Sequence, residues 1–241
     1  MVKAVIFDLD DTLISEKDYI ISGFKHIAKL MCIKTGINEN QLLHDLMDLY
    51  EENPKQVFNR LYEKYNMVYT DEMITELVNE YRCHLPDIRY YDDVLPCLNA
   101  LKESGIKTGI ITDGYEVSQR QKLKVIDADK YFDAIILTDE LGREYWKPHP
   151  RPFEIMKHKL DVEFDEMVYV GDNPEKDFYI SKFYPIKTVR INRNGIYTNK
   201  AYYKGVRETF YIKNMQELLN ILKKNNPELF IVTYTTVPGT A

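Results

Sequence analysis

Residues 3–14 read KAVIFDLDDTLI, a short apolar run followed at once by carboxylates. The run Lys3–Phe7 is rich in β-branched and aromatic residues, and this composition predicts a buried strand. Asp8, Asp10 and Asp11 follow it directly, at the strand end where open α/β sheets bind their ligands. The stretch therefore predicts an α/β sheet that carries a polar site at one edge.

The second part of the chain, after about Asp92, alternates between strand-like and helical patterns. The further strands are predicted at Lys107–Thr112, Ala134–Leu137, Met167–Val170 and Lys187–Ile191. The helices are predicted at Val94–Glu103, Tyr115–Ile126, Arg151–Lys159 and about Met215–Lys224. Apolar strands that alternate with helices predict a parallel sheet covered by helices on both faces.

The segment between the first two strands is helical almost throughout. Its signals are Gly36 ending the helix at Tyr19–Lys34, Asn38 capping Glu39–Glu51, Pro54 opening a third helix, and Thr70 opening a fourth that closes before Pro86. An insertion at this point stands above the carboxyl ends of the strands. We therefore predict an α/β core formed by residues 1–14 and 95–241, and an all-helical cap formed by residues 15–94.

Size, charge and cysteine content exclude several classes of protein. The chain has 241 residues and a formal net charge of −6, so it offers no general basic surface for nucleic acid. The uncharged stretch Phe230–Ala241 is too short for a membrane span, which needs about 20 apolar residues, and is interpreted as a tail. Cys32, Cys83 and Cys97 are far apart and predict free thiols, hence a cytoplasmic location. Nothing in the sequence indicates the oligomeric state.

Polar clusters recur where the predicted strands end or the next helix begins. They are Asp8–Thr12, Thr112–Gly114, Lys147–Pro148 and Gly171–Asp177. Taken singly, each cluster is also typical of an ordinary turn or helix cap. Their recurrence in one predicted sheet favours a common site.

The charges of these clusters point to phosphoryl chemistry. Four carboxylates are expected to converge: Asp8, Asp10, Asp172 and Asp177. Neighbouring carboxylates stay ionised only beside cations, and those available are Lys147 and a bound divalent ion. Oxygen ligands without His or Cys favour Mg²⁺. A Thr hydroxyl, a Gly-containing loop and a Lys ammonium are suited to a phosphate group.

The motifs DLDDTL, TDG, KP and GDNPEKD, in this order, resemble the four signature motifs of the haloacid dehalogenase superfamily of phosphohydrolases. The resemblance extends from about Val2 to Ile191, and the helical insertion is similar to the family's C1-type cap. It implies a Rossmann-like α/β core with an inserted helical cap.

The resemblance also implies the chemical roles of the acidic residues. Asp8 would be the nucleophile that forms an aspartyl-phosphate, and Asp10 would be the general acid and base. The backbone carbonyl of Asp10 and the carboxylates of Asp8 and Asp172 would hold Mg²⁺. We expect Asp11 to lie in a surface turn.

The remaining motif residues would bind the phosphate group. Thr112 and the backbone of Asp113 and Gly114 would bind its oxygens, while Lys147 would neutralise its charge. Asp177 would orient Lys147 or a metal-bound water. A carboxylate beside a phosphate is repulsive, but there is no conflict if the Asp113 backbone N–H binds the phosphate and the side chain turns away.

These expectations favour a Mg²⁺-dependent phosphatase that acts on a small phosphorylated metabolite, such as a sugar phosphate or a nucleoside monophosphate. A phosphomutase remains open, since it uses the same motifs. A dehalogenase is disfavoured because Asp10 and Asp172 are both present, and a catalytically silent binding protein because every motif position is filled. The early cap residues Glu16, Lys17 and Tyr19 are candidates to face the substrate.

Overall fold

The computed structural model describes residues 1–225 and residue 227, so the predicted tail at Phe230–Ala241 lies outside the described residues. Its strands form one parallel sheet in the order β3-β2-β1-β4-β5-β6. They are β1 (Ala4–Phe7), β2 (Lys107–Thr112), β3 (Ala134–Leu137), β4 (Met167–Gly171), β5 (Lys187–Ile191) and β6 (Phe210–Ile212). The predicted parallel α/β sheet is confirmed, and β6 is an additional strand that the sequence analysis missed.

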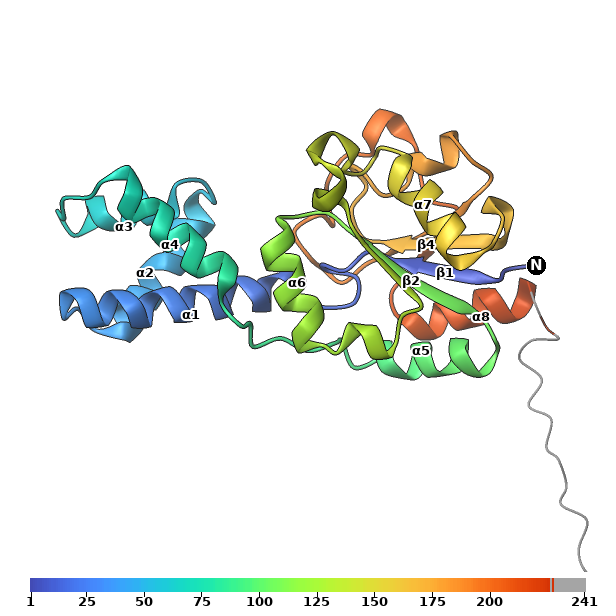
Figure 1. Cartoon of the computed structure of the whole chain (residues 1–241), viewed down its shortest axis with the longest axis horizontal. Helices are drawn as coiled ribbons and strands as arrows, with labels where there is room; N and C mark the ends of the chain where they lie inside the picture. The colour runs from blue at the N-terminus through green and yellow to red at the C-terminus, as the bar shows by residue number, and fades with distance from the viewer. Residues whose placement is uncertain (226, 228–241) are drawn as a thin grey trace, which may run out of the picture.

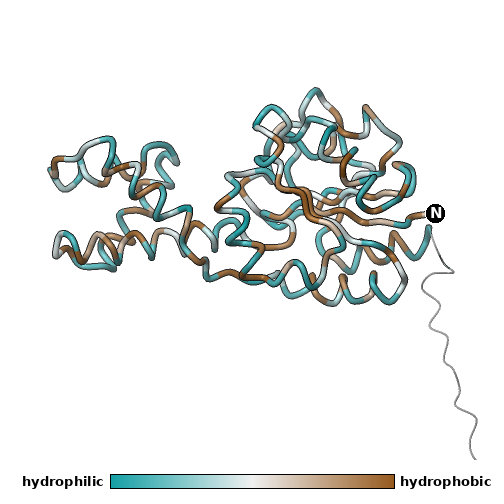
Figure 2. Tube along the Cα trace, in the orientation of Figure 1, coloured by the Kyte–Doolittle hydropathy of each residue, from teal (hydrophilic) through white to brown (hydrophobic). Residues whose placement is uncertain are grey.

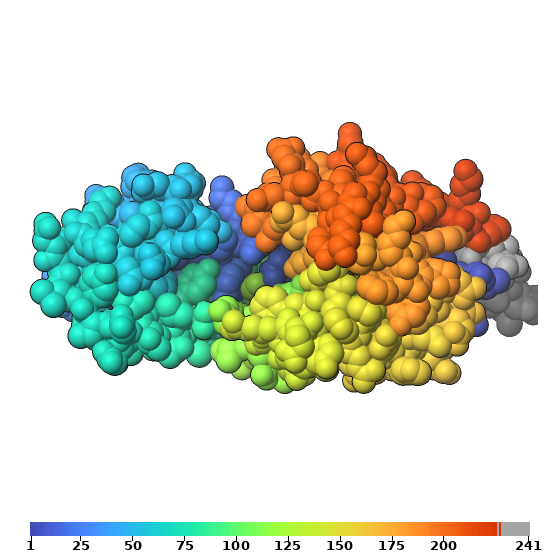
Figure 3. Space-filling view, turned by 90° about the horizontal axis from the view of Figure 1, so that it is seen from above, coloured from blue at the N-terminus to red at the C-terminus, as the bar shows by residue number. Residues whose placement is uncertain are grey.

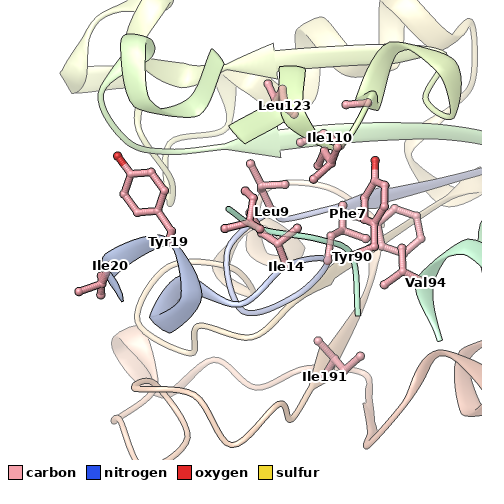
Figure 4. Packing of buried hydrophobic residues seen from close by; sticks show 14 of the residues in the cluster. Phe7, Leu9, Ile14, Tyr19, Ile20, Tyr90, Val94, Ile110, Leu123 and Ile191 are labelled. Atoms are coloured by element: carbon pink, nitrogen blue, oxygen red, sulfur yellow. The ribbon is translucent and has the colours of Figure 1, made fainter. Parts of the chain in front are cut away.

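Helices cover both faces of the sheet, as the alternation of side chains along β1 requires. Val5 and Phe7 pack in one hydrophobic layer, with α5 (Val94–Glu103), α6 (Glu116–Val125) and α8 (Met215–Asn225). Ala4 and Ile6 pack on the opposite side, with α7 (Arg151–Leu160). Figure 2 shows the apolar strands running through the middle of the core, and Figure 4 shows Phe7 and Ile110 within the first layer.

Short 3₁₀ helices complete the connections between these elements. They are η1 (Ala128–Lys130), η2 (Thr138–Leu141), η3 (Arg143–Tyr145), η4 (Phe164–Glu166), η5 (Tyr179–Lys182) and η6 (Tyr203–Gly205). In the part of the chain that the structure describes, no helix combines the length and the apolar character that crossing a bilayer requires.

The first four of the helices that follow β1 pack on one another beside the sheet (Figure 1). They are α1 (Glu16–Thr35), α2 (Glu39–Glu52), α3 (Val57–Lys64) and α4 (Asp71–Cys83). Aromatic rings join them, because Tyr81 of α4 lies 5.7 Å from Phe24 of α1 and 6.0 Å from Phe58 of α3, measured between ring centroids. We call α1–α4 the cap helices.

The two chain segments that connect the cap helices to the sheet lie side by side. Ile14 forms an isolated antiparallel bridge with Tyr90. The backbone N–H of Tyr91 donates to the carbonyl of Leu13 at 3.0 Å. The chain therefore leaves the sheet and returns to it at nearly the same place.

Most of the predicted helix ends in this segment agree with the structure. Asn38 and Thr70 accept backbone N–H groups as N-caps, and Gly36 has the left-handed φ of 73° expected after α1. The prediction that Pro54 opens the third helix is wrong, because α3 begins at Val57. The Asn53 side chain instead accepts the backbone N–H of Lys55 at 2.9 Å, which holds a turn there.

Candidate active site

The polar clusters meet at the carboxyl ends of the central strands. Phe7 of β1 pairs with Ile110 of β2 on one side and with Val170 of β4 on the other. The next residue, Asp8, donates its backbone N–H to the Val170 carbonyl at 2.8 Å. This register brings Asp8 beside Asp172, which follows β4.

Lys147 is the central cation of this group and is fully buried. Its Nζ donates to Asp8 Oδ1 at 2.7 Å, to Asp177 Oδ1 at 2.9 Å and to the Tyr169 hydroxyl at 2.7 Å. Burial alone would lower the pKa of Lys147, but Asp177 and Asp8 raise it above its ordinary value. The ammonium group is therefore charged whenever the neighbouring carboxylates are ionised.

Asp8, Asp172 and Asp177 form a compact acidic cluster. Each offers a carboxylate oxygen within 4.8 Å of the others, and all three are buried. Burial raises the pKa of Asp8 to about 6, although Lys147 opposes this. Burial, together with the charges of Asp177 and Asp8, raises the pKa of Asp172 well above its ordinary value.

A divalent cation fits this cluster. Its donors are all oxygens. Lys147 and Lys176 also face the buried Asp113, so two lysines cannot balance all of these carboxylates. Asp177 is already engaged, since Oδ1 accepts from Lys147 and Oδ2 accepts the Asn173 backbone N–H at 2.9 Å. Asp8 and Asp172 are therefore the side chains best placed to hold the metal.

Asp10 lies at the same edge but turns its carboxylate toward α6. Lys122 Nζ donates to both of its oxygens, at 2.7 and 2.9 Å, and Gln119 Nε2 donates to Oδ2 at 2.9 Å. Gln119 Nε2 also contacts Thr112 Oγ1 at 2.6 Å. The amide thus links the Asp10 side chain to the loop after β2.

Three residues of this site were not predicted from the sequence: Gln119, Lys122 and Tyr169. The first two are buried polar residues three positions apart on α6, where an amphipathic helix is expected to place apolar side chains. Polar residues at these positions of the helix pattern could therefore have indicated a functional role for Gln119 and Lys122. Tyr169 lies within the apolar strand β4, so no pattern in the sequence indicated a role for its hydroxyl.

The Asp113 side chain is held by groups of the protein. It accepts hydrogen bonds from Thr138 Oγ1 at 2.8 Å, from the Lys147 backbone N–H at 3.1 Å and from Lys176 Nζ at 3.0 Å. Burial would raise the pKa of Asp113, but Lys147 and Lys176 hold it below its ordinary value. Repulsion by phosphate is avoided because two lysines already balance this charge.

The prediction that Asp11 lies in a surface turn is wrong. It is 4 % exposed and adopts a left-handed φ of 48°. Its Oδ1 accepts the backbone N–H of Glu16 at 2.9 Å, at the first residue of α1. Asp11 therefore joins the strand-end loop to the beginning of the cap helices.

Two adjoining cavities open onto this site. The inner cavity, of about 410 Å³, is lined by Asp8, Lys147 and Asp172 among others. The outer cavity, of about 420 Å³, lies between the cap helices and α6, and its walls include the rings of Tyr19 and Phe24. Figure 3 shows the hollow between the cap helices and the sheet.

The parallel sheet carries buried acidic groups and a buried lysine at its strand ends, beside an inserted set of helices. This is the architecture of an enzyme with a Rossmann-like core and a helical insertion. The chain belongs to the haloacid dehalogenase-like hydrolases, since the model of that family matches residues 5–191. The resemblance inferred from the four motifs is confirmed.

Two phosphatases and one crystal structure are similar to this chain over nearly its whole length. The glyceraldehyde 3-phosphate phosphatase of Methanopyrus kandleri is 28% identical over 231 residues, covering 93% of this chain and 98% of the relative. The pyrophosphatase PpaX of Bacillus cereus is also 28% identical, with the same coverage. A crystal structure of a HAD phosphatase from Thermococcus onnurineus superposes with a TM-score of 0.60 at 28% identity, covering 92% of this chain and 98% of that one.

Proposed function

We propose that this hydrolase is a Mg²⁺-dependent phosphatase that acts on a small phosphorylated metabolite through an aspartyl-phosphate on Asp8. The observation that carries the proposal is the buried Lys147 ammonium, 2.7 Å from Asp8 Oδ1, beside the acidic cluster. The phosphatase names of the relatives support the same reaction class.

Asp8 would attack phosphorus, forming a bond between its carboxylate oxygen and the phosphoryl group while the bond to the leaving alkoxide breaks. Asp10 would give its proton to that oxygen and then accept one from the attacking water, which releases inorganic phosphate and restores Asp8. When bound by Asp8, Asp172 and the Asp10 backbone carbonyl, Mg²⁺ would supply positive charge to the phosphate oxygens.

The loop after β2 would bind the remaining phosphate oxygens. The donors are the Thr112 hydroxyl and the backbone N–H groups of Asp113 and Gly114, while Lys147 supplies charge from the other side. Gly114 has a φ of 133°, a conformation that side chains disfavour. A glycine at this position lets the backbone approach the phosphate.

We further propose that residues 15–94 act as a cap domain on a core formed by residues 1–14 and 95–241. Since α5 begins at Val94, the proposed boundary coincides with the start of this helix. Closure of the cap helices over the outer cavity would exclude bulk water and large substrates. This favours sugar phosphates or nucleoside monophosphates as substrates. A cytoplasmic location remains a prediction from the sequence.

The test is phosphate release from 4-nitrophenyl phosphate and from a panel of metabolite phosphates, with Mg²⁺ and with EDTA. We expect release to require the metal and to be lost in Asp8→Asn, while the exposed control Asp87→Asn retains it. Conversion of one sugar phosphate into its isomer without phosphate release would identify a phosphomutase instead. Release that persists in Asp8→Asn would contradict the proposed nucleophile.

A further inference from the structure

Glu16 is a half-buried acidic residue that the proposed mechanism does not use. It is the first residue of α1, and its backbone N–H is fixed by Asp11 at 2.9 Å. Its Oε2 is buried and has no hydrogen-bond partner among the described residues. Burial, and next the charge of Asp10, raises the pKa of Glu16 to about 7. A carboxylate oxygen in this situation is costly unless a donor reaches it.

Glu16 also lies where the two cavities meet. The residues that line both of them are Asp10, Glu16, Asp113 and Gly114. A phosphate ester bound for attack by Asp8 has its phosphorus in the inner cavity, so its organic part extends into the outer one. The first carbon atoms beyond the ester oxygen must therefore pass these four residues.

The carboxylates of the other two acidic residues at this junction are already hydrogen-bonded within the protein. Lys122 and Gln119 donate to the Asp10 carboxylate. The donors to the Asp113 carboxylate are Thr138 Oγ1, the Lys147 backbone N–H and Lys176 Nζ. Gly114 has no side chain. Among the described residues that line both cavities, Glu16 is the one with a buried side-chain oxygen that has no hydrogen-bond partner.

We propose that Glu16 is a specificity-determining residue that accepts a hydrogen bond from a substrate hydroxyl within two or three bonds of the phosphoester. The inference rests on the proposed phosphatase function. It assigns the substrates to phosphate esters of hydroxylated carbon skeletons, and it disfavours esters of plain alkyl or aryl alcohols. A site built to bind a hydroxyl discriminates against the analogue that lacks it, since its own polar group then stays buried and unpaired.

The test compares glycerol 3-phosphate with n-propyl phosphate, which differ only in their hydroxyl groups. For the wild type we expect kcat/KM to favour the hydroxylated ester by roughly 10- to 100-fold, the effect of one hydrogen bond to a charged group. In Glu16→Ala and in the isosteric Glu16→Gln the preference should shrink at least fivefold. Hydrolysis of 4-nitrophenyl phosphate should change less than threefold. The expectation that Lys17 faces the substrate is wrong, because Lys17 is exposed and lines neither cavity. Lys17→Ala, at the next residue of α1, is therefore the matched control.

Two results would overturn this inference while leaving the phosphatase function intact. One is a wild type without preference between the two esters. The other is an equal loss on all substrates in both Glu16 variants, which would make Glu16 a positioning residue for the nearby Lys122.

If no ester is hydrolysed, the proposed function fails but Glu16 can still be tested. The affinities of the two esters for Asp8→Asn, with and without Glu16→Gln, would be measured by calorimetry. Selective loss of glycerol 3-phosphate binding in the double variant supports the role of Glu16, and equal affinities overturn it.

Discussion

Replacing Asp8 by Asn is expected to stabilise the metal-free protein while it abolishes phosphate release. Burial raises the pKa of Asp8 from 3.8 to about 6 in the folded chain. A pKa that is higher in the folded state means that the protonated carboxyl is the favoured form. The stabilisation that comes from the raised pKa of Asp8 is complete below the pKa that Asp8 has in the unfolded chain. It is lost as the pH rises through about 6. At about 1.36 kcal/mol for each pH unit between the two pKa values, the loss above pH 7 is about 3 kcal/mol.

The assay is urea unfolding in EDTA at pH 4, 6 and 8. Asp8→Asn keeps the shape of the side chain and cannot ionise, so at pH 8 its free energy of unfolding should exceed that of the wild type by about 3 kcal/mol. At pH 4 the two should nearly coincide. Added Mg²⁺ should narrow the gap at pH 8, because it binds the folded wild type more tightly.

Asp113→Asn is the matched control with the opposite sign. Although burial opposes it, Lys147 and Lys176 hold the pKa of Asp113 below its ordinary value. Its stabilising effect is therefore present above the unfolded pKa and is lost as the pH falls through the folded one. Asp113→Asn should be less stable than the wild type at pH 8. A metal-free Asp8→Asn protein that is also less stable than the wild type at pH 8 would refute the electrostatic reasoning.

Three further predictions concern the neighbourhood of the site and the cap helices. In Gly171→Ala the added Cβ would lie 2.7 Å from the carboxylate carbon of Asp177 and displace that side chain. Steady-state kinetics should show kcat at least tenfold lower, and urea titration a free energy of unfolding lower by about 1–3 kcal/mol. Lys122→Met removes the ammonium 2.7 Å from Asp10, and kcat should fall by roughly tenfold with an altered pH–rate profile, whereas an unchanged profile would exclude a role for this pair. Asn38→Ala removes the cap of α2, so thermal unfolding should reveal a loss of about 1 kcal/mol, and a marked change in kcat at 25 °C would contradict a purely structural role.

The sequence predicted those parts of the fold that depend on local pattern. β1 is a continuous apolar run and β2 contains the β-branched pair Ile110–Ile111. The acidic residues at the ends of these strands could be placed because a strand end is a local feature. β6 was missed since it has only three residues, of which one is buried. Its strand character comes from pairing with β5, which no local pattern records.

The partners of the candidate catalytic groups were beyond such reasoning. Lys122 and Gln119 contact Asp10 across 112 and 109 residues of chain. Nothing near Asp10 in the sequence specifies these contacts. The partners of the Asp113 side chain could not be predicted for the same reason, because Lys176, which donates to it, comes from the loop after β4.

The bridge between Ile14 and Tyr90 has a consequence for the order in which this chain folds. Ala4 of β1 pairs with Lys107 of β2, so the central strands must close a long loop before they gain any contact. If the cap helices form first, the bridge shortens that loop, and the entropic cost of closure falls by roughly 1 kcal/mol. Pulse-labelled hydrogen exchange should then detect protection in α1 before β1. During synthesis these helices are complete before β2 exists, so the insertion is the first part of the chain able to fold, and the sheet assembles around its base.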